Sequence, residues 1–396
     1  MDIQKLKISV AGIRGIVGEN FTIPVVSQLV AAFGQKVGGR IVIGRDTRPS
    51  GAAFQKIAVG TLLGLGIDVV DVGVLPIPTI ELIVQETKSQ GGIVITASHN
   101  PPQWNALKLL DSEGTFVDEK VIEEITTSPK EISWATFQKI GNLFDFPSPA
   151  EFHIERILEL PYFSVSKIRQ AKFKIVYDGN NGTGCLVIPT LLETLGCEVI
   201  SINDEPDGIF AHPPEPIPEN IRETAKLVKE TGAHLGMVTD PDADRLALID
   251  EWGEPVGEEY TLTIAADYIL SKQSGAVVTN LSTSGLIDFI AQKHRVPIYR
   301  EKIGEYNVVK GLKVYKGVIG GEGNGGVILP DFHYGRDAVL AAVLVLAFLA
   351  EKKSPLSKVV KNYPEYYMLK EKLPNFRIKK IEKELIEKLK PQEVNR

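Results

Sequence analysis

The sequence has little cysteine, no long apolar run and no excess of positive charge. Only 2 of its 396 residues are cysteines, Cys185 and Cys197, and they form no CxxC pair or zinc-ligand spacing, which excludes a disulfide scaffold and a cysteine-based zinc site. The net charge is −6, so no basic field favours nucleic acid or an anionic membrane as a partner. The longest apolar run extends only from Ala338 to Ala350. Because a membrane-spanning helix needs about 20 apolar residues, this run predicts a buried helix instead.

The length and composition of the chain are typical of a soluble globular enzyme. The length of 396 residues and the apolar content of 43% predict about two to four domains, at roughly 100–200 residues per domain. Residues 1–5 lack the apolar core of a signal peptide, so we expect a cytoplasmic protein with reduced thiols.

The most informative stretch is T-A-S-H-N-P-P at residues 96–102. It follows Ile93–Ile95, a short β-branched run that predicts the end of a buried strand. The two prolines fix φ and stiffen the loop, so Ser98 is held where α/β proteins place their chemistry. Ser98 is the candidate nucleophile, and His99 and Lys108 are candidate proton carriers or phosphate clamps. A generic Ser-His-Asn-Pro string is more often a simple turn.

A strand, a polar turn and a helix recur three times along the chain. The copies open at residues 40–51, 174–184 and 276–285, each with a polar turn that contains glycine. Strands that alternate with helices predict βαβ units and a largely parallel sheet in each copy. Chance similarity could explain one pair of copies, but three copies favour duplication. We therefore predict an α/β protein of three tandem related domains with mixed, largely parallel sheets.

Composition shifts divide the chain into residues 1–147, 148–250, 251–364 and 365–396. A polar, proline-rich break at residues 146–149 ends the first segment. A turn between apolar strands ends the second. The last segment contains apolar residues at helical spacing, with lysines and glutamates between them.

Three carboxylates, those of Asp240, Asp242 and Asp244, lie at alternate positions on a predicted loop between two apolar strands. Oxygen ligands without a nearby histidine or cysteine favour Mg²⁺ over zinc. A solvated acidic turn is the alternative, but three clustered like charges repel one another and a cation removes that repulsion. An EF-hand is not favoured, because no glycine follows Asp244 and a strand begins at Leu246. The cluster predicts a Mg²⁺ site.

Two stretches rich in glycine carry further candidates. Residues 11–19 predict a tight turn beside Arg14, whose planar guanidinium suits a phosphate. Residues 320–326, G-G-E-G-N-G-G, permit close backbone approach, and Glu322 and Asn324 offer hydrogen-bonding groups to sugar hydroxyls. Alone, either stretch could be no more than a turn.

In this order, the strings resemble the motifs of the α-D-phosphohexomutases, which include phosphoglucomutase, phosphomannomutase and phosphoglucosamine mutase. T-A-S-H-N-P-P-x-x-N-x-x-K resembles the phosphoserine loop, D-P-D-A-D-R the metal loop and G-E-G-N-G the sugar-recognition loop. The stretch around Arg14 resembles the family's T-S-G-x-R-G segment. The sequence departs from the family at Ala106 and Pro241, where glycine is usual, and at Asn324, where serine is usual.

The resemblance implies phosphoryl transfer between O1 and O6 of a hexose through hexose 1,6-bisphosphate, with Mg²⁺ as cofactor and hexose phosphates as ligands. Ser98 is implied to be phosphorylated at rest, and a phosphate oxygen on it to complete the metal site. Either His99 or Lys108 is implied to act as acid or base. The implied site residues are Arg14, Ser98, His99, Lys108, Asp240, Asp242, Asp244, Arg245, Glu322 and Asn324.

The family also has a fourth domain, whose R-P-S-G-T-E-P loop grips the substrate phosphate. No such string occurs here. By the resemblance, residues 365–396 form a short C-terminal remnant of that domain, left by truncation or natural to a member without the clamp.

Two other functions stay open at this point. A Mg²⁺-dependent sugar-phosphate phosphohydrolase could use an aspartate nucleophile, but it leaves the Ser98 loop unexplained. The second alternative is a non-catalytic relative that only binds sugar phosphates. The intact Ser98, Lys108 and three aspartates argue against it. The preferred sugar (glucose, mannose or glucosamine) and the formation of a homo-oligomer are not decided by the sequence.

Overall fold

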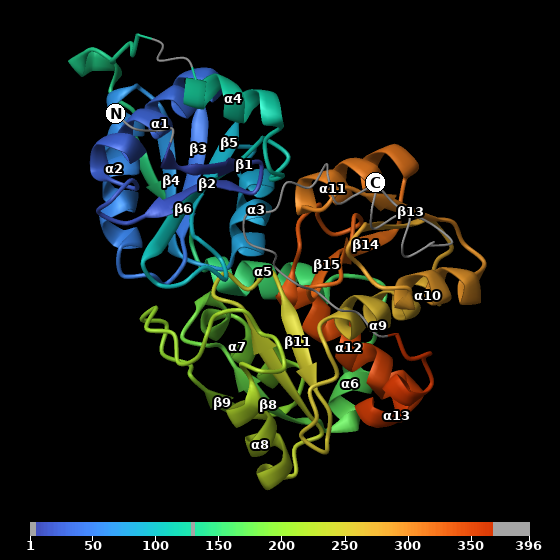
Figure 1. Cartoon of the computed structure of the whole chain (residues 1–396). Coiled ribbons are helices and arrows are strands. Elements are labelled where there is room, and N and C mark those ends of the chain that lie inside the picture. The colour runs from blue at the N-terminus through green and yellow to red at the C-terminus, as the bar shows by residue number, and fades with distance from the viewer. Residues whose placement is uncertain (1–4, 128–130, 367–396) are drawn as a thin grey trace, which may run out of the picture.

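The computed structural model describes residues 5–127 and 131–366, in which strands and helices alternate along most of the chain (Figure 1). None of the helices in these residues is long and apolar enough to cross a membrane. The predicted remnant of a fourth domain lies almost entirely outside the described residues, so it stays a prediction.

The first sheet has seven strands in the order β1-β2-β6-β5-β3-β4-β7. Its helices cover both faces of the sheet (Figure 1). The elements are β1 (Lys7–Ser9), β2 (Gly12–Ile16), α1 (Ile23–Val37), β3 (Arg40–Arg45), α2 (Gly51–Gly64), β4 (Asp68–Val74), α3 (Ile77–Glu86), β5 (Gly91–Ile95), β6 (Trp104–Leu110), α4 (Glu119–Thr127), η2 (Phe137–Lys139) and β7 (Leu143–Asp145).

The second sheet has four strands in the order β11-β10-β8-β9. Its elements are α5 (Pro149–Leu158), α6 (Val165–Ala171), β8 (Lys174–Asp178), η3 (Thr183–Leu186), α7 (Ile188–Thr194), β9 (Glu198–Ile202), α8 (Arg222–Thr231), β10 (Leu235–Thr239) and β11 (Leu246–Ile249).

The third sheet has four strands in the order β13-β12-β14-β15. Its elements are α9 (Glu259–Leu270), β12 (Val277–Asn280), α10 (Leu286–His294), β13 (Ile298–Glu301), α11 (Glu305–Tyr315), β14 (Ile319–Glu322), β15 (Gly326–Ile328), α12 (Ala338–Lys352) and α13 (Leu356–Lys361).

The three sheets share one four-stranded unit. The units are β4-β3-β5-β6, β9-β8-β10-β11 and β13-β12-β14-β15, and in each one three neighbouring parallel strands are followed by an antiparallel fourth. The prediction of three related α/β domains with mixed, largely parallel sheets is therefore confirmed. The first sheet adds β1, β2 and β7 to its unit.

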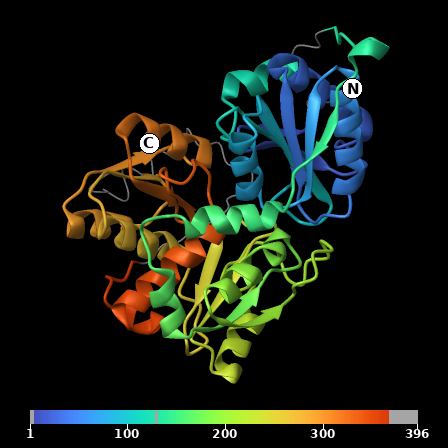
Figure 2. The ribbon, with the colours of Figure 1, turned by 180° about the vertical axis from the view of Figure 1, so that it is seen from behind.

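A single core joins the second and third sheets. It contains side chains from both sheets and from α9 and α12, so that α12 lies between them (Figure 1). Ala338 to Leu349 of α12 are all buried, which confirms the buried helix predicted from the apolar run. Helix α5 passes between the first sheet's helices and the other two units (Figure 2). The boundaries proposed after residues 147, 250 and 364 stay predictions.

Candidate active site

The same position in each four-stranded unit carries one of the candidate loops. In every unit the third strand runs into a loop that leads to the antiparallel fourth strand, and these loops span residues 96–103, 240–245 and 323–325. Two side-chain hydrogen bonds join the first loop to the second, and one backbone hydrogen bond joins Leu246, directly after the second loop, to Gly325 in the third. Equivalent ends of three related units therefore face one centre.

Ser98 lies in the first loop in a left-handed backbone conformation. Its φ is 49°, which is uncommon for a residue with a side chain, and its N–H donates to Thr96 Oγ1 at 3.0 Å. Ser98 is only 3% exposed. Its hydroxyl donates to Asp240 Oδ2 at 3.1 Å and lies 3.3 Å from His99 Nδ1. The hydroxyl thus points at the aspartate loop.

The buried side chain of Arg48 holds the Ser98 loop in place. The guanidinium of Arg48 donates four hydrogen bonds of 2.6 to 3.0 Å to loop carbonyls, those of Ser98, Asn100, Pro101 and Trp104. Its Nε donates to Asp46 Oδ2 at 3.0 Å, and the ring of Phe210, from the second unit, lies 5.0 Å from the guanidinium. A planar cation with several donors suits such a cluster of carbonyls. Arg48 therefore sets the path of the backbone on both sides of the prolines.

The second loop brings three buried carboxylates together. One ligand oxygen each from Asp240, Asp242 and Asp244 lies within 4.8 Å of the others. The Oδ1 atoms of Asp242 and Asp244 are buried and have no hydrogen-bond partner in the described part of the chain. Burial raises the pKa of Asp240, and its two neighbours raise it further. A hard divalent cation would satisfy the unpaired oxygens and remove the repulsion, so these residues fit Mg²⁺.

Lys108 projects from β6 onto the aspartates. Its Nζ lies 2.8 Å from Asp242 Oδ2 and 3.8 Å from Asp244 Oδ2, and the residue is 2% exposed. Burial alone lowers the pKa of Lys108, but the two carboxylates outweigh it and the pKa is raised. The same contact holds the pKa of Asp242 below its ordinary value against the opposing effect of burial. Lys108 is therefore a fixed cation beside the three aspartates.

His99 and Arg245 line the same centre. Burial, helped by the positive charge of Arg245, lowers the pKa of His99 to about 2. The imidazole is therefore neutral at physiological pH and its Nδ1 can accept a proton. Arg245 lies 3.7 Å from Asp244 and 4.0 Å from Asp240, and its buried Nε has no hydrogen-bond partner within the described ranges. An anion could take that donor.

The turn expected beside Arg14 lies at residues 10–11, between β1 and β2. Arg14 lies inside strand β2, which pairs with β1 and β6, and the unusual backbone angle belongs to Gly12, whose φ is 130°. The backbone at Arg14 is extended because β2 pairs with a strand on each side. Burial lowers the pKa of Arg14, and the negative charge of Asp242 opposes that effect. The guanidinium of Arg14 therefore interacts electrostatically with the same aspartate loop.

The third loop reaches the aspartates through an arginine. Glu322 ends β14, and Asn324 Nδ2 lies 3.4 Å from Glu322 Oε2. Arg336, just before α12, donates from Nη1 to Glu322 Oε2 at 2.8 Å and from Nη2 to Asp244 Oδ2 at 2.5 Å. Its Nε donates to Glu305 at 3.0 Å. All the candidates named from the sequence therefore surround one centre.

Sequence reasoning missed three charged residues of this centre: Asp46, Arg48 and Arg336. The first two stand in the polar turn that follows β3. Because ligands of open α/β sheets bind at the carboxyl ends of strands, that turn was a usable signal. Arg336 stands in no motif, so no pattern in the sequence points to it.

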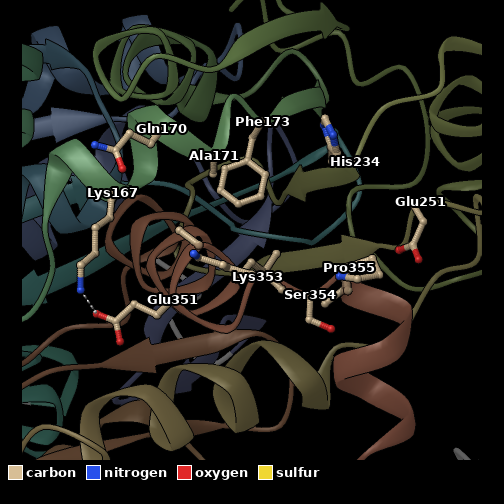
Figure 3. Close-up of a pocket in the computed structure, with 13 residues that line it drawn as sticks. Lys167, Gln170, Ala171, Phe173, His234, Glu251, Glu351, Lys353, Ser354 and Pro355 are labelled. Carbon is tan, nitrogen blue, oxygen red and sulfur yellow. Dashed lines mark ion pairs between the residues drawn. The ribbon is translucent and has the colours of Figure 1, made fainter.

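A large cavity lies away from this centre. It has a volume of about 910 Å³, is lined by α6, Phe173 and the C-terminal end of α12, and shares no lining residue with the site above (Figure 3). Two of its charged groups pair with each other: Lys167 points to Glu351 (Figure 3), which also binds Lys272. We assign no ligand to this cavity.

Family models match the chain in three consecutive segments. They describe the phosphoglucomutase/phosphomannomutase alpha/beta/alpha domains I, II and III, and they match residues 5–136, 151–253 and 257–367. These segments contain, in order, the Ser98 loop, the aspartate loop and the Glu322 loop.

Relatives over the same length agree. A phosphoglucomutase/phosphomannomutase of Thermococcus kodakarensis is 38% identical over 374 residues, which are 91% of this chain and 81% of that protein. A phosphoglucosamine/phosphogalactosamine mutase of Sulfurisphaera tokodaii is 31% identical, over 95% of this chain and 85% of its own length. The crystal structure of a phosphoglucomutase/phosphomannomutase family protein from Burkholderia thailandensis, 26% identical, superposes with a TM-score of 0.79 over 91% of this chain and 81% of that one. A chain that matches all three domain models and gathers their loops around one centre belongs to the phosphoglucomutase/phosphomannomutase family of sugar-phosphate mutases.

Proposed function

We propose that this protein interconverts hexose 1-phosphate and hexose 6-phosphate through a phosphoserine at Ser98 and a hexose 1,6-bisphosphate intermediate. One observation carries the proposal: the Ser98 hydroxyl lies 3.1 Å from one of three clustered, buried aspartates. A serine that only shaped a turn would need no cation site beside it.

In the proposed reaction, a sugar hydroxyl attacks the phosphorus on Ser98, the bond from phosphorus to Ser98 Oγ breaks and a new bond to the sugar oxygen forms. The bisphosphate then turns over and returns its other phosphoryl group to Ser98 Oγ. Mg²⁺, held by Asp240, Asp242 and Asp244, would withdraw negative charge from the transferring group. Positioning and charge neutralisation supply most of the catalysis in such reactions.

His99 and Lys108 have different roles in this proposal. His99 Nδ1 lies 3.3 Å from Ser98 Oγ, so by its position it is the group proposed to pass the proton of the attacking sugar hydroxyl to Ser98 Oγ as the bond to phosphorus breaks. Lys108 keeps its proton beside Asp242, so it serves as an electrostatic clamp. Arg14 and Arg245 are proposed to bind phosphate oxygens, because each has an unpaired buried Nε in the described structure.

The sugar is proposed to meet Glu322 and Asn324. Glu322 is buried but ends a strand at the centre, and Asn324 is half-buried beside it. Their carboxylate and amide groups can accept from and donate to hydroxyls. The preference among glucose, mannose and glucosamine is left to experiment.

The proposal is tested by an assay coupled to formation of the 6-phosphate. Glucose, mannose and glucosamine 1-phosphates are supplied with and without a hexose 1,6-bisphosphate primer, and Ser98 phosphorylation is followed by mass spectrometry. We expect turnover of at least one sugar, stimulation by the primer and a phosphate on Ser98. Ser98→Ala should lose turnover and keep sugar-phosphate binding, because it removes only the acceptor.

The exposed Ser112, in the turn after β6, offers a matched control. Ser112→Ala should retain full turnover and the phosphate on Ser98. Release of inorganic phosphate without a mutase product would identify a phosphohydrolase. An unmodified Ser98 that also resists labelling by the bisphosphate would overturn the phosphoserine mechanism.

A further inference from the structure

We propose that Arg336 is a positioning residue that couples cation binding at the aspartate loop to sugar-phosphate binding at the Glu322 loop. The inference rests on the proposed function, because it takes the aspartate loop as the Mg²⁺ site and the Glu322 loop as the sugar site. It concerns a residue that stands in none of the motifs described above.

The guanidinium of Arg336 is shared among three carboxylates from three elements. Nε donates to Glu305 at the start of α11, Nη1 to Glu322 at the end of β14, and Nη2 to Asp244 in the loop between β10 and β11. Arg336 is 7% exposed. Since a buried network of this kind responds as a unit, a change at one carboxylate is transmitted to the other two.

The position of Arg336 is built into the surrounding backbone. A Cβ atom at Gly326 would lie 2.3 Å from the Cδ atom of Arg336, so the side chain occupies the space that any larger residue at Gly326 would need. The N–H of Arg336 also donates to Glu305 Oε1 at 3.1 Å. The arginine is therefore held at both its backbone and its guanidinium.

A bound cation and Arg336 compete for Asp244. The Oδ2 atom of Asp244 accepts from Arg336, and its Oδ1 atom has no hydrogen-bond partner among the described residues. A divalent cation at this carboxylate repels the guanidinium, since like charges in a buried site interact strongly. Binding of the cation thereby weakens the contact between Arg336 and Asp244 and frees Nη2.

The freed donor faces the proposed sugar site. The Oε1 atom of Glu322 accepts from Asn280 Nδ2 at 2.6 Å and from the N–H of Gly304 at 3.0 Å. Its Oε2 atom accepts from Arg336 Nη1 at 2.8 Å, while Asn324 Nδ2 lies 3.4 Å away. Nη1 can stay on Glu322 while Nη2 turns to an oxygen of the sugar phosphate. Cation binding thus prepares the sugar site.

Thermodynamic linkage makes the coupling reciprocal. If Mg²⁺ strengthens sugar-phosphate binding by some factor, the sugar phosphate strengthens Mg²⁺ binding by the same factor. For a coupling through one buried arginine we expect a factor of about five to 150.

Calorimetry in a Ser98→Ala background tests this without turnover. Mg²⁺ is titrated with and without saturating glucose 1-phosphate, and glucose 1-phosphate is titrated in EDTA and in saturating Mg²⁺.

In Arg336→Met, Mg²⁺ alone should bind at least about threefold more tightly, because a competing cation is gone. Glucose 1-phosphate in saturating Mg²⁺ should bind about tenfold more weakly, because a charge-assisted hydrogen bond is lost, and the coupling factor should fall close to one. A merely structural role would weaken both ligands.

Two further variants keep the test decisive. Gly326→Ala retains every charge but displaces the stem of Arg336, and it should lose part of the coupling even if Arg336→Met does not fold. Lys293→Met removes a positive charge from the ion pair with Asp267, in the same unit but in neither loop, and it should leave the coupling unchanged.

The outcomes separate this inference from the proposed function. A Ser98→Ala background that binds neither Mg²⁺ nor glucose 1-phosphate would contradict the proposed function itself. If the background binds both and Gly326→Ala together with every folded Arg336 variant keeps the wild-type coupling factor, the role of Arg336 is overturned and the proposed function stands.

Discussion

Asp242 illustrates how single charges are balanced at the centre. Its Oδ2 atom accepts from Lys108 Nζ at 2.8 Å and from Thr96 Oγ1 at 3.2 Å. Its Oδ1 atom is buried without a partner in the described residues. Buried polar atoms are almost always paired, so a carboxylate that is oriented through one oxygen and unpaired at the other is suited to bind a cation.

Asp242→Asn should weaken Mg²⁺ binding and reduce turnover by at least ~10²-fold, the scale for the loss of one electrostatic stabiliser. The measurement is turnover against Mg²⁺ concentration, with Mg²⁺ affinity determined by calorimetry. Asp250→Asn is the control: Asp250 follows the other end of β11, and its Oδ1 atom accepts from two backbone N–H groups, which the asparagine oxygen can replace. Near-normal turnover of the unmutated protein in EDTA would refute the metal assignment.

Among the elements, the loop between β5 and β6 depends most on contacts from outside itself. The prolines stiffen it, but Arg48 determines where its carbonyls point, through hydrogen bonds that span more than 50 residues of sequence. Phe210 from the second unit covers the guanidinium. The conformation of Ser98 is therefore a product of two units.

Arg48→Lys should slow the labelling of Ser98 by hexose 1,6-bisphosphate at least about tenfold, because one ammonium cannot replace the planar, multiple donors of the guanidinium. Rapid-quench labelling measures the rate, and KM and kcat are determined separately to show that kcat carries the effect. Arg45→Lys is the matched control, since Arg45 contacts Gln55 and the Asp46 carbonyl and none of the loop. Equal labelling rates in the wild type and in Arg48→Lys would refute the clamp.

At the scale of the whole molecule, a buried polar network joins α3, α5 and the start of α12. His153 Nε2 lies 2.9 Å and His333 Nε2 3.1 Å from Asp337 Oδ2, while His333 Nδ1 lies 3.5 Å from Glu81 Oε2. His153 Nδ1 lies 2.8 Å from Thr79 Oγ1. This network links the first unit to the core shared by the other two, so its protonation affects how the units hold together.

Folding stability should fall as pH rises from about 6.5 to about 9. Burial alone lowers the pKa of His333, but Asp337 and Glu81 outweigh it and raise the pKa to about 9. A raised pKa adds stability that is complete below the ordinary value of 6.5 and is lost as pH passes the folded value. Burial raises the pKa of Glu81 to about 8, which acts in the same direction. The expected loss is roughly 2–3 kcal/mol.

Denaturant titrations between pH 6 and pH 9.5 measure this loss. His333→Gln should flatten the change across that range, because it keeps a donor to Asp337 and removes the titrating proton. His234→Gln, at an exposed histidine outside the network, should behave like the wild type. An unfolding free energy that rises with pH in the wild type would contradict the assignment.

Much of the fold and part of the site followed from local patterns. The strand before Ser98, the three repeated strand-turn-helix openings and the buried helix of residues 338–350 were predictable, because periodicity, glycine turns and apolar runs reflect neighbours along the chain. The pairing of the strand that carries Arg14 was not predicted, because it is decided by β1 and β6.

The sequence by itself determined which residues are suited to nucleophilic attack, metal binding and sugar binding. The stiffened loop of the serine, the alternating set of aspartates and the glycine-rich loop are each defined by residues that are adjacent in the chain. Only the tertiary structure decided that they meet. Ser98 and Asp240 are 142 residues apart, and Arg336 and Asp244 are 92 apart. Contacts of that range come from the packing of whole units against one another, which leaves no periodic trace in the chain, so the contacts of Arg48 and Arg336 became visible only after the three units were in place.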